Sequence, residues 1–158
     1  MPVGKWMVFD TNVYVAALRG GVGGASFERL EETAPRTFLA SVVSAELRAG
    51  ALDDAGRKLV LDLVRRFERV GRIVVPTAGT WHDAGDVLAK IARREPALRT
   101  KVRSLWNDAL IALSASQIGA TVVTENMRDF RLLRRYIRFE LESAPAVADD
   151  GKTSRRRS

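Results

Sequence analysis

Trp6-Met7-Val8-Phe9-Asp10-Thr11-Asn12 is the stretch of sequence that decides the fold. Its four consecutive apolar residues, 6–9, are typical of a strand that is buried on both faces. A carboxylate and two small polar residues then end the run, and helical apolar spacing begins at Val13. Ligands of open α/β sheets bind outside the carboxyl ends of the strands, so Asp10 is expected at a ligand-binding edge. The alternative is that Asp10 only caps the helix that follows.

The order of strand and then helix recurs along the chain. Apolar runs predict further strands at 37–40, 73–75, 121–123 and 137–141. Helical spacing predicts helices at 13–18, 26–32, 42–47, 53–70, 80–93, 105–118 and 132–136, with Ser26 and Ser41 as N-caps of the second and third. This alternation is typical of an α/β fold, with a central, mainly parallel sheet flanked by helices in an α/β/α arrangement.

The length and composition indicate one globular domain. A chain of 158 residues can bury a sizeable core, and its 46% hydrophobic and 28% charged residues are usual for a soluble protein. We predict a domain over 1–143. From Ala144 onward the chain is small, polar and charged, so we predict a disordered basic tail over 144–158.

Composition also bears on location. No apolar run approaches the roughly 18 residues that span a membrane, and the first residues lack the pattern of a signal peptide. We therefore expect no membrane association. The chain contains no cysteine, which excludes disulfides and thiolate metal sites and fits a cytoplasmic location.

The charge balance is strongly basic. The sequence has 26 Lys and Arg against 19 Asp and Glu, a formal net charge of +7. Such a field attracts polyanions, including nucleic acid. Part of the excess is local, because Arg155, Arg156 and Arg157 all lie in the predicted tail.

Asp108 is the most informative carboxylate after Asp10. In the predicted helix it shares a face with apolar residues such as Leu105 and Ile111. An unpaired carboxylate on a buried face is costly, so it is normally paired or bound to a metal. A buried salt bridge to Arg99 or Arg103 and a metal site are therefore both open.

Glu46 and Asp129 have local explanations when each is taken alone. Glu46 lies near the start of a helix, where negative charge suits the dipole, and Asp129 follows a strand, where turn or N-cap chemistry is common. In a parallel sheet, however, these two residues can meet Asp10 and Asp108 at one rim. Carboxylates that close need a cation, and a set of oxygen ligands favours Mg²⁺ or Mn²⁺ over zinc. A hard divalent cation in a basic protein suits phosphodiester hydrolysis.

Four blocks of sequence carry a resemblance to a known family. They are Val8-Phe9-Asp10-Thr11-Asn12-Val13, Ser44-Ala45-Glu46-Leu47 with Gly50, Asn107-Asp108-Ala109-Leu110-Ile111-Ala112, and Val122-Val123-Thr124-Glu125-Asn126-Met127-Arg128-Asp129-Phe130. In order, spacing and context, the chain resembles the PIN-domain ribonucleases, in particular the VapC-like toxins of bacterial toxin–antitoxin modules. The resemblance covers roughly 8–141. It implies a PIN-like fold and a metal-dependent endoribonuclease whose catalytic and Mg²⁺- or Mn²⁺-binding residues are Asp10, Glu46, Asp108 and Asp129.

The resemblance also implies supporting residues. Polar support for the acidic site is expected from Asn12, Ser44, Thr124 and Asn126. PIN domains vary in which residue of the last block completes the acidic set, so Asn126 is an alternative to Asp129 for part of that role.

Just before the Asp108 helix, a basic segment is expected to contact the RNA backbone through Arg99, Lys101 and Arg103. Trp81 and Trp106 lie at helical spacing with apolar residues and are expected to pack in the core.

Two protein partners are expected. A VapC-like toxin implies a cognate antitoxin, and the acidic rim would attract a basic antitoxin side chain as readily as a metal. The remainder of the antitoxin segment needs an apolar groove, expected beside the helices at 13–18 and 47–63. The second expected partner is another copy of the chain, in a homodimer.

The sequence also bears on functions other than that of a ribonuclease toxin. A phosphatase of the haloacid-dehalogenase type needs a second Asp two residues after the first, and Asn12 occupies that position. A structure-specific DNA nuclease of the same fold usually carries long insertions, for which this chain has little room. A non-catalytic PIN-type RNA-binding module and a housekeeping nuclease remain open alternatives.

Overall fold

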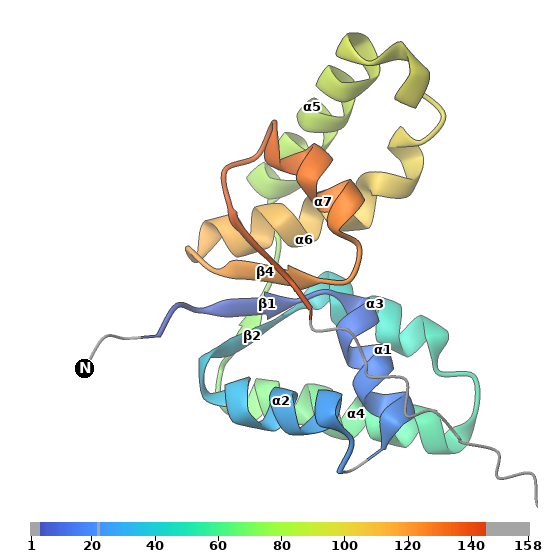
Figure 1. The fold of residues 1–158 in the computed structure, drawn as a ribbon, viewed down its shortest axis with the longest axis vertical. Coiled ribbons are helices and arrows are strands. Elements are labelled where there is room, and N and C mark those ends of the chain that lie inside the picture. The colour runs from blue at the N-terminus through green and yellow to red at the C-terminus, as the bar shows by residue number, and fades with distance from the viewer. Residues whose placement is uncertain (1–3, 22, 145–158) are drawn as a thin grey trace, which may run out of the picture.

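The chain forms a five-stranded parallel sheet with helices on both sides, in a computed structural model that describes residues 4–21 and 23–144 (Figure 1). The strands stand in the order β3-β2-β1-β4-β5, and every neighbouring pair is parallel. Their bounds are β1 (Met7–Phe9), β2 (Thr37–Ala40), β3 (Ile73–Val74), β4 (Thr121–Thr124) and β5 (Glu140–Ser143). The predicted α/β class and parallel sheet are confirmed.

The central strand β1 sets the position of the candidate site. Its three residues are apolar and buried, because helices cover the sheet on both faces. In the β1–β4 pair, Phe9 lies opposite Val123, and the amide of Asp10 donates to the carbonyl of Val123 over 2.9 Å. The register therefore brings Asp10, just beyond β1, beside Thr124, the last residue of β4.

The helices divide between the two sides of the sheet. Figure 1 shows α5, α6 and α7 on one side and α1, α2 and α4 on the other. The bounds are α1 (Thr11–Gly20), α2 (Ala25–Thr33), α3 (Ser41–Gly50), α4 (Asp54–Arg69), α5 (Ala78–Arg94), α6 (Trp106–Gln117) and α7 (Met127–Arg134). Short 3-10 helices cover Ala34–Arg36, Pro96–Leu98 and Val102–Leu105. The most apolar of these helices, α6, is buried against the sheet from Ala109 to Ala112.

Two predicted helix caps are wrong. Ser26 is the second residue of α2, whose N-cap is Gly24, and Ser41 is the first residue of α3, whose N-cap is Ala40. The reason is that Gly24 and Ala40 themselves have extended backbone, so each takes the cap position, and neither cap makes a side-chain hydrogen bond. The start of α4 is as predicted, with the Asp53 carboxylate accepting from the Gly56 amide at 2.7 Å.

The last helix and strand begin at other residues than predicted. The helix α7 begins at Met127 instead of Leu132, because Asn126 caps it through a hydrogen bond from the Asp129 amide at 3.5 Å. The strand β5 begins at Glu140, whereas the sequence predicted a strand over 137–141. The apolar residues Ile137 and Phe139 are buried in the connection after α7, which explains why this segment reads as a strand.

Trp81 and Trp106 do not pack in the core. Their exposed fractions are 51% and 38%, and their rings lie against each other with centroids 6.5 Å apart. The buried stripe of α5 is made instead by other apolar residues, Ala84, Val87, Leu88 and Ile91. In the part of the chain that the structure describes, no helix is long and apolar enough to cross a membrane. Beyond Ala144, the predicted tail lies outside the described residues.

Candidate metal centre at the sheet edge

Asp10 is buried at the carboxyl end of β1, with an exposed fraction of 5%. Its Oδ1 accepts from the Thr11 amide and its Oδ2 from the Thr124 hydroxyl, each at 2.7 Å. Burial raises the pKa of Asp10 above its ordinary value, and the charges of Glu46 and Glu125 add to this, whereas the two hydrogen bonds oppose it. Asp10 therefore both caps α1 and presents a buried carboxylate at the sheet edge.

Glu46 reaches the same edge from α3. Its Oε2 accepts from the hydroxyl of Thr11, and its Oε1 accepts from Asn107 Nδ2 at 2.8 Å. These two bonds hold Glu46 between the start of α1 and the start of α6. Its charge raises the pKa values of Asp10 and Asp108, so the three carboxylates lie within electrostatic reach of one another.

Asp108 lies in the first turn of α6 and is half-buried. Among the described residues it forms no ion pair with Arg99 or Arg103, and its side chain accepts only from Asn126 Nδ2, at 3.5 Å. Burial, followed by the charges of the other three carboxylates of the acidic set, raises the pKa of Asp108 to about 7, against a lowering by Lys101. Asp108 therefore does not form the salt bridge to Arg99 or Arg103 that the sequence left open, and it lies close to the other three carboxylates.

Asp129 completes the cluster from the first turn of α7. Its Oδ2 accepts from Asn126 Nδ2 at 3.1 Å, and its Oδ1 forms an ion pair with the Lys101 ammonium. Burial raises the pKa of Asp129, but the hydrogen bonds from Lys101 and Asn126 and the charges of Lys101 and Arg128 outweigh it, so the pKa is lowered. The side-chain amide of Asn126 contacts both Asp108 and Asp129. Asn126 and Asp129, the two residues considered for the last position of the acidic set, therefore lie together in the site.

Of the four predicted supporting residues, three belong to this hydrogen-bond network. Thr124 Oγ1 donates to Asp10. It accepts from the backbone N–H of Asn126 at 2.9 Å and from Asn12 Nδ2 at 3.5 Å. The side-chain oxygen of Asn12 in turn accepts from the Glu125 amide at 3.4 Å. Ser44 is half-buried on α3, and within the described chain its hydroxyl takes no part in this network.

The three basic residues predicted to contact RNA differ in whether their side chains are already engaged within the protein. Lys101 is held in the acidic site by Asp129, and Arg99 Nε donates to the Ala92 carbonyl at 3.1 Å, whereas Arg103 is exposed. Two residues of the network, Thr11 and Asn107, were not singled out from the sequence. Their positions directly beside Asp10 and Asp108 are the only sequence signal for them.

The donor set fits a hard divalent cation by its chemistry. No three Asp, Glu or His side chains within 4–21 and 23–144 are arranged to hold one ion in their present positions. Each carboxylate is instead engaged by a donor from a neighbouring element. The Lys101 ammonium supplies positive charge at Asp129, whereas burial and then the three neighbouring carboxylates raise the pKa of Asp108. A bound divalent cation would relieve the repulsion among these carboxylates.

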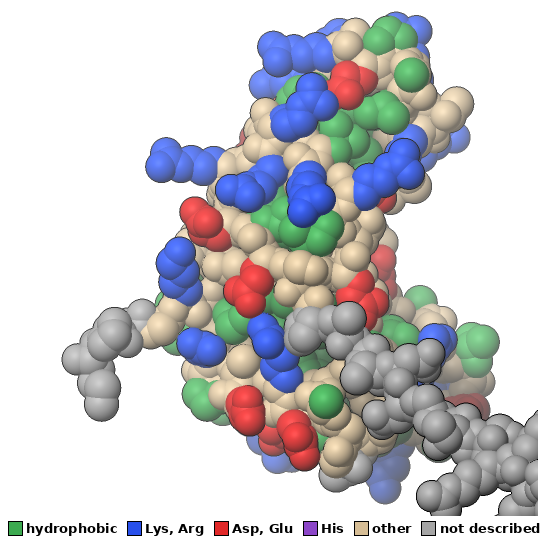
Figure 2. All heavy atoms as spheres, in the orientation of Figure 1, with side chains coloured by type: hydrophobic (Ala, Val, Ile, Leu, Met, Phe, Trp, Pro, Cys, Tyr) green, Lys and Arg blue, Asp and Glu red, His purple; other side chains and the backbone are tan. Residues whose placement is uncertain are grey.

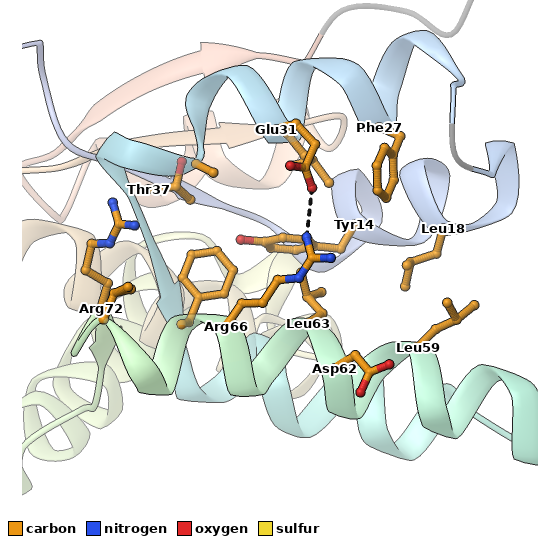
Figure 3. A pocket seen from close by; sticks show the side chains of 14 residues that line it. Tyr14, Leu18, Phe27, Glu31, Thr37, Leu59, Asp62, Leu63, Arg66 and Arg72 are labelled. Atoms are coloured by element: carbon orange, nitrogen blue, oxygen red, sulfur yellow. Dashed lines mark hydrogen bonds and ion pairs between the residues drawn. The ribbon is translucent and has the colours of Figure 1, made fainter.

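An apolar groove lies on the α1, α2 and α4 side of the sheet. One hollow, of about 380 Å³, lies between α2 and α4, and Figure 3 shows its side chains, including Tyr14, Leu18, Phe27, Leu59 and Leu63. A second hollow shares Leu18 and Leu59 with the first, and its lining continues along α1, α3 and α4 to Glu46. Together the two hollows, called here the apolar groove, lead from the α2–α4 side to the acidic cluster.

The Glu31–Arg66 ion pair, at 2.9 Å, joins α2 and α4 across the first hollow, as Figure 3 shows. Both side chains are more than half exposed, so this pair contributes little to stability. Beneath it, the Tyr14 hydroxyl is buried and has no hydrogen-bond partner among the described residues. The first hollow therefore has an apolar floor that is crossed at the surface by one weak ion pair.

Three solved structures with this fold illustrate the similarity. They are VapBC from Salmonella typhimurium bound to DNA, VapBC2 from Rickettsia felis bound to a promoter DNA fragment, and FitAcB from Neisseria gonorrhoeae. Identities are 23%, 22% and 20%, and TM-scores are 0.61, 0.58 and 0.57. The matches cover 88%, 88% and 85% of this chain and 98%, 98% and 95% of those chains. At these identities the likeness establishes the fold alone.

At the level of sequence, the chain is similar to a family and not significantly to any single curated protein. The family model of the PIN domain matches residues 7–136, which is well over half of the chain and includes all four carboxylates of the acidic cluster. The resemblance inferred from the four sequence blocks is thereby confirmed at the level of the family, and the chain belongs to the PIN domain family.

Proposed function

We propose that this protein is a Mg²⁺- or Mn²⁺-dependent endoribonuclease and the toxin of a VapBC-like toxin–antitoxin module. One observation carries the proposal: the carboxylates of Asp10, Glu46, Asp108 and Asp129 come from four different elements and converge at the carboxyl edge of the sheet. Membership of the PIN family, whose members are generally nucleases, supports hydrolysis of a nucleic acid. The net charge of +7 supports a polyanionic substrate.

The proposed chemistry assigns a role to each group. Asp10, Asp108, Glu46 and Asp129 would hold the cation, which would activate water and stabilise charge on the phosphoryl oxygens. Thr124 and Asn126 fix the carboxylates of Asp10 and Asp129 through hydrogen bonds. Asp108 must lose its proton before it binds a cation, and its raised pKa makes this step pH-dependent near neutrality.

A cleavage assay tests the proposed enzyme. The purified chain should cut a labelled single-stranded RNA in Mg²⁺, should be inactive in EDTA, and should spare single-stranded DNA of the same sequence. Binding without cleavage in any divalent cation would favour the non-catalytic RNA-binding module. Equal cleavage of RNA and DNA would refute the ribonuclease assignment while leaving a PIN nuclease.

The proposed protein partner is an antitoxin that occupies the apolar groove. The groove offers leucines from α1 and α4 on its floor, and its second hollow reaches Glu46, so an extended or helical segment could lie in it and place a basic side chain among the carboxylates. The groove expected beside 13–18 and 47–63 matches the second hollow, and the first adds Phe27 and Leu30 of α2. Folding on binding is the expected mode for such a segment.

Expression in cells separates a toxin from a housekeeping nuclease. Expression of this chain alone should arrest growth, and co-expression of a small protein encoded beside it should relieve the arrest. Harmless expression of a chain that cleaves RNA in vitro would favour the housekeeping nuclease. We also propose a cytoplasmic location, where RNA substrates are found.

The proposed homodimer is supported by the exposed Trp81–Trp106 pair. Two large aromatic side chains in mutual contact on the surface are unusual away from an interface, because aromatic residues are enriched in the centres of protein–protein contacts. Trp106 also directly precedes Asn107, which donates to Glu46. A dimer through this pair would therefore place the contact one residue from the acidic cluster.

A further inference from the structure

The helix α7 and the turn that follows it carry a row of exposed arginines. Arg128, Arg131, Arg134, Arg135 and Arg138 are all exposed, whereas Phe130, Leu133 and Ile137 are buried beneath them. Figure 2 shows Lys and Arg side chains gathered over the part of the surface formed by α7 and α5. This set of five arginines is called here the α7 basic face.

Counter-charges are sparse on this face. Among the described residues, the only ion pair made by the five arginines is that of Arg135 with Glu95, at 3.0 Å. Arg134 and Arg138 line a hollow of about 460 Å³ together with Tyr136 and a single acidic residue, Glu140. Most of these guanidinium groups are therefore free to bind an anionic partner.

The α7 basic face begins at the acidic cluster. Asn126 and Asp129, which belong to that cluster, form the cap and first turn of the same helix. At a rise of about 1.5 Å per residue, α7 carries the row of arginines some 12 Å away from Asn126, ending near Arg134. A strand of nucleic acid cleaved at the cluster would thus meet the arginines within a few nucleotides.

We propose that the α7 basic face binds the phosphate backbone of the RNA substrate on one side of the cleavage point. The identity of this polyanion rests on the proposed ribonuclease function. The face adds to the basic segment 99–103, whose RNA contacts stay a prediction; there Lys101 is engaged by Asp129 and Arg99 by the Ala92 carbonyl, and Arg103 is exposed. Backbone contacts of this kind position a strand without reading its sequence.

The test compares two variants with the same change in net charge. One is the triple variant Arg131→Gln, Arg134→Gln, Arg138→Gln, because Gln removes the charge, keeps a polar side chain and has a similar helix propensity. The matched control is Arg57→Gln, Arg65→Gln, Arg69→Gln on α4, which removes three exposed arginines on the other side of the sheet. Binding of a fluorescent single-stranded RNA is measured by anisotropy in EDTA, where no cleavage occurs, over a range of salt concentrations.

The α7 variant should bind RNA roughly tenfold more weakly at low salt, and its logarithmic salt slope should fall by about 2, since each phosphate contact contributes about 0.7 on a single strand. The α4 variant should keep nearly the whole slope. Equal losses in both variants would overturn the inference, because diffuse net charge would then explain binding. Loss of duplex DNA binding with RNA binding unchanged would also overturn it.

Cleavage measured on the same proteins separates this inference from the proposed function. If the unmodified chain cleaves RNA and the α7 variant binds and cleaves as well as it does, the inference fails and the proposed function stands. If RNA binding depends on the α7 basic face but no cation supports cleavage, the inference stands and the proposed nuclease fails.

Discussion

The hydroxyl of Thr124 donates a hydrogen bond of 2.7 Å to Asp10, although 114 positions separate the two residues in the chain. The bond is possible because β1 and β4 are parallel neighbours whose carboxyl ends coincide. It also lowers the pKa of Asp10 against the effect of burial. A residue at the end of β4 thus lowers the pKa of the carboxylate that follows the neighbouring strand β1.

Removal of this hydroxyl should weaken metal binding. In Thr124→Val, the pKa of Asp10 should rise, and Mn²⁺ affinity at pH 7 should fall by about tenfold or more, in the range seen for residues that support metal ligands. Thr124→Ser keeps the donor and should restore most of the affinity. Calorimetric titration with Mn²⁺ checks both variants, and equal affinities for Val and Ser would show that the hydrogen bond has no such role.

Stability without metal should fall as pH rises from 4 to 7. The pKa of Asp108 is about 7 in the folded chain against 3.8 ordinarily, so in this window the folded state retains a proton that the unfolded chain has lost. Proton release then favours unfolding, by up to about 1.4 kcal/mol per pH unit. The raised pKa of Asp10 acts in the same direction.

Urea denaturation in EDTA at pH 5 and pH 8 measures this effect. The free energy of unfolding should be lower at pH 8, and Asp108→Asn should remove much of the difference and be the more stable protein at pH 8. A variant with the same pH dependence as the unmodified chain would show that Asp108 does not carry the effect.

A charge in the apolar groove should prevent antitoxin binding. Leu59 is half exposed and lines both hollows, so Leu59→Asp would place a carboxylate on the groove floor at little cost to the free chain. Affinity for the antitoxin should fall at least tenfold, because an unpaired charge would be buried in the complex. Val75→Asp, at an apolar residue outside the groove that is at least as exposed, is the control. Equal effects of the two changes would place the interface elsewhere.

The homodimer should depend on the tryptophan pair. Trp81→Glu adds charge at the proposed contact and should give a monomer in sedimentation equilibrium at concentrations where the unmodified chain is a dimer. His82→Glu adds the same charge one residue further along α5, also at an exposed position, and should remain dimeric. A monomeric unmodified chain would contradict the homodimer itself.

The parallel sheet, and the edge of it at which Asp10 and the other carboxylates lie, could be predicted from the sequence. Strand ends could be predicted because apolar runs stop at polar residues, and parallel strands bring those ends to one edge, as Asp10 and Thr124 illustrate. What failed depended on packing between distant segments. Trp81 and Trp106 fit a helical stripe but lie at its rim, and the apolar residues Ile137 and Phe139 belong to a buried connection.

The details of the site could not be predicted for a related reason. The ion pair of Lys101 with Asp129 and the bond of Asn107 to Glu46 depend on how α3, α6 and α7 are placed by the sheet. No local pattern in the sequence specifies these partners. Asp108 is the exception, because a carboxylate on an apolar helix face already indicated an unusual environment, and its pKa is raised to about 7.

The most direct test of the metal-dependent ribonuclease is the cleavage rate of a labelled single-stranded RNA in Mg²⁺ by the unmodified chain and by Asp108→Asn. Asp83→Asn, at an exposed carboxylate on α5, serves as the matched control, and circular dichroism checks that both variants are folded. We predict that Asp108→Asn lowers the rate by at least 100-fold and that Asp83→Asn leaves it unchanged. Full activity in a folded Asp108→Asn protein would contradict the assignment of the acidic cluster as the catalytic metal site.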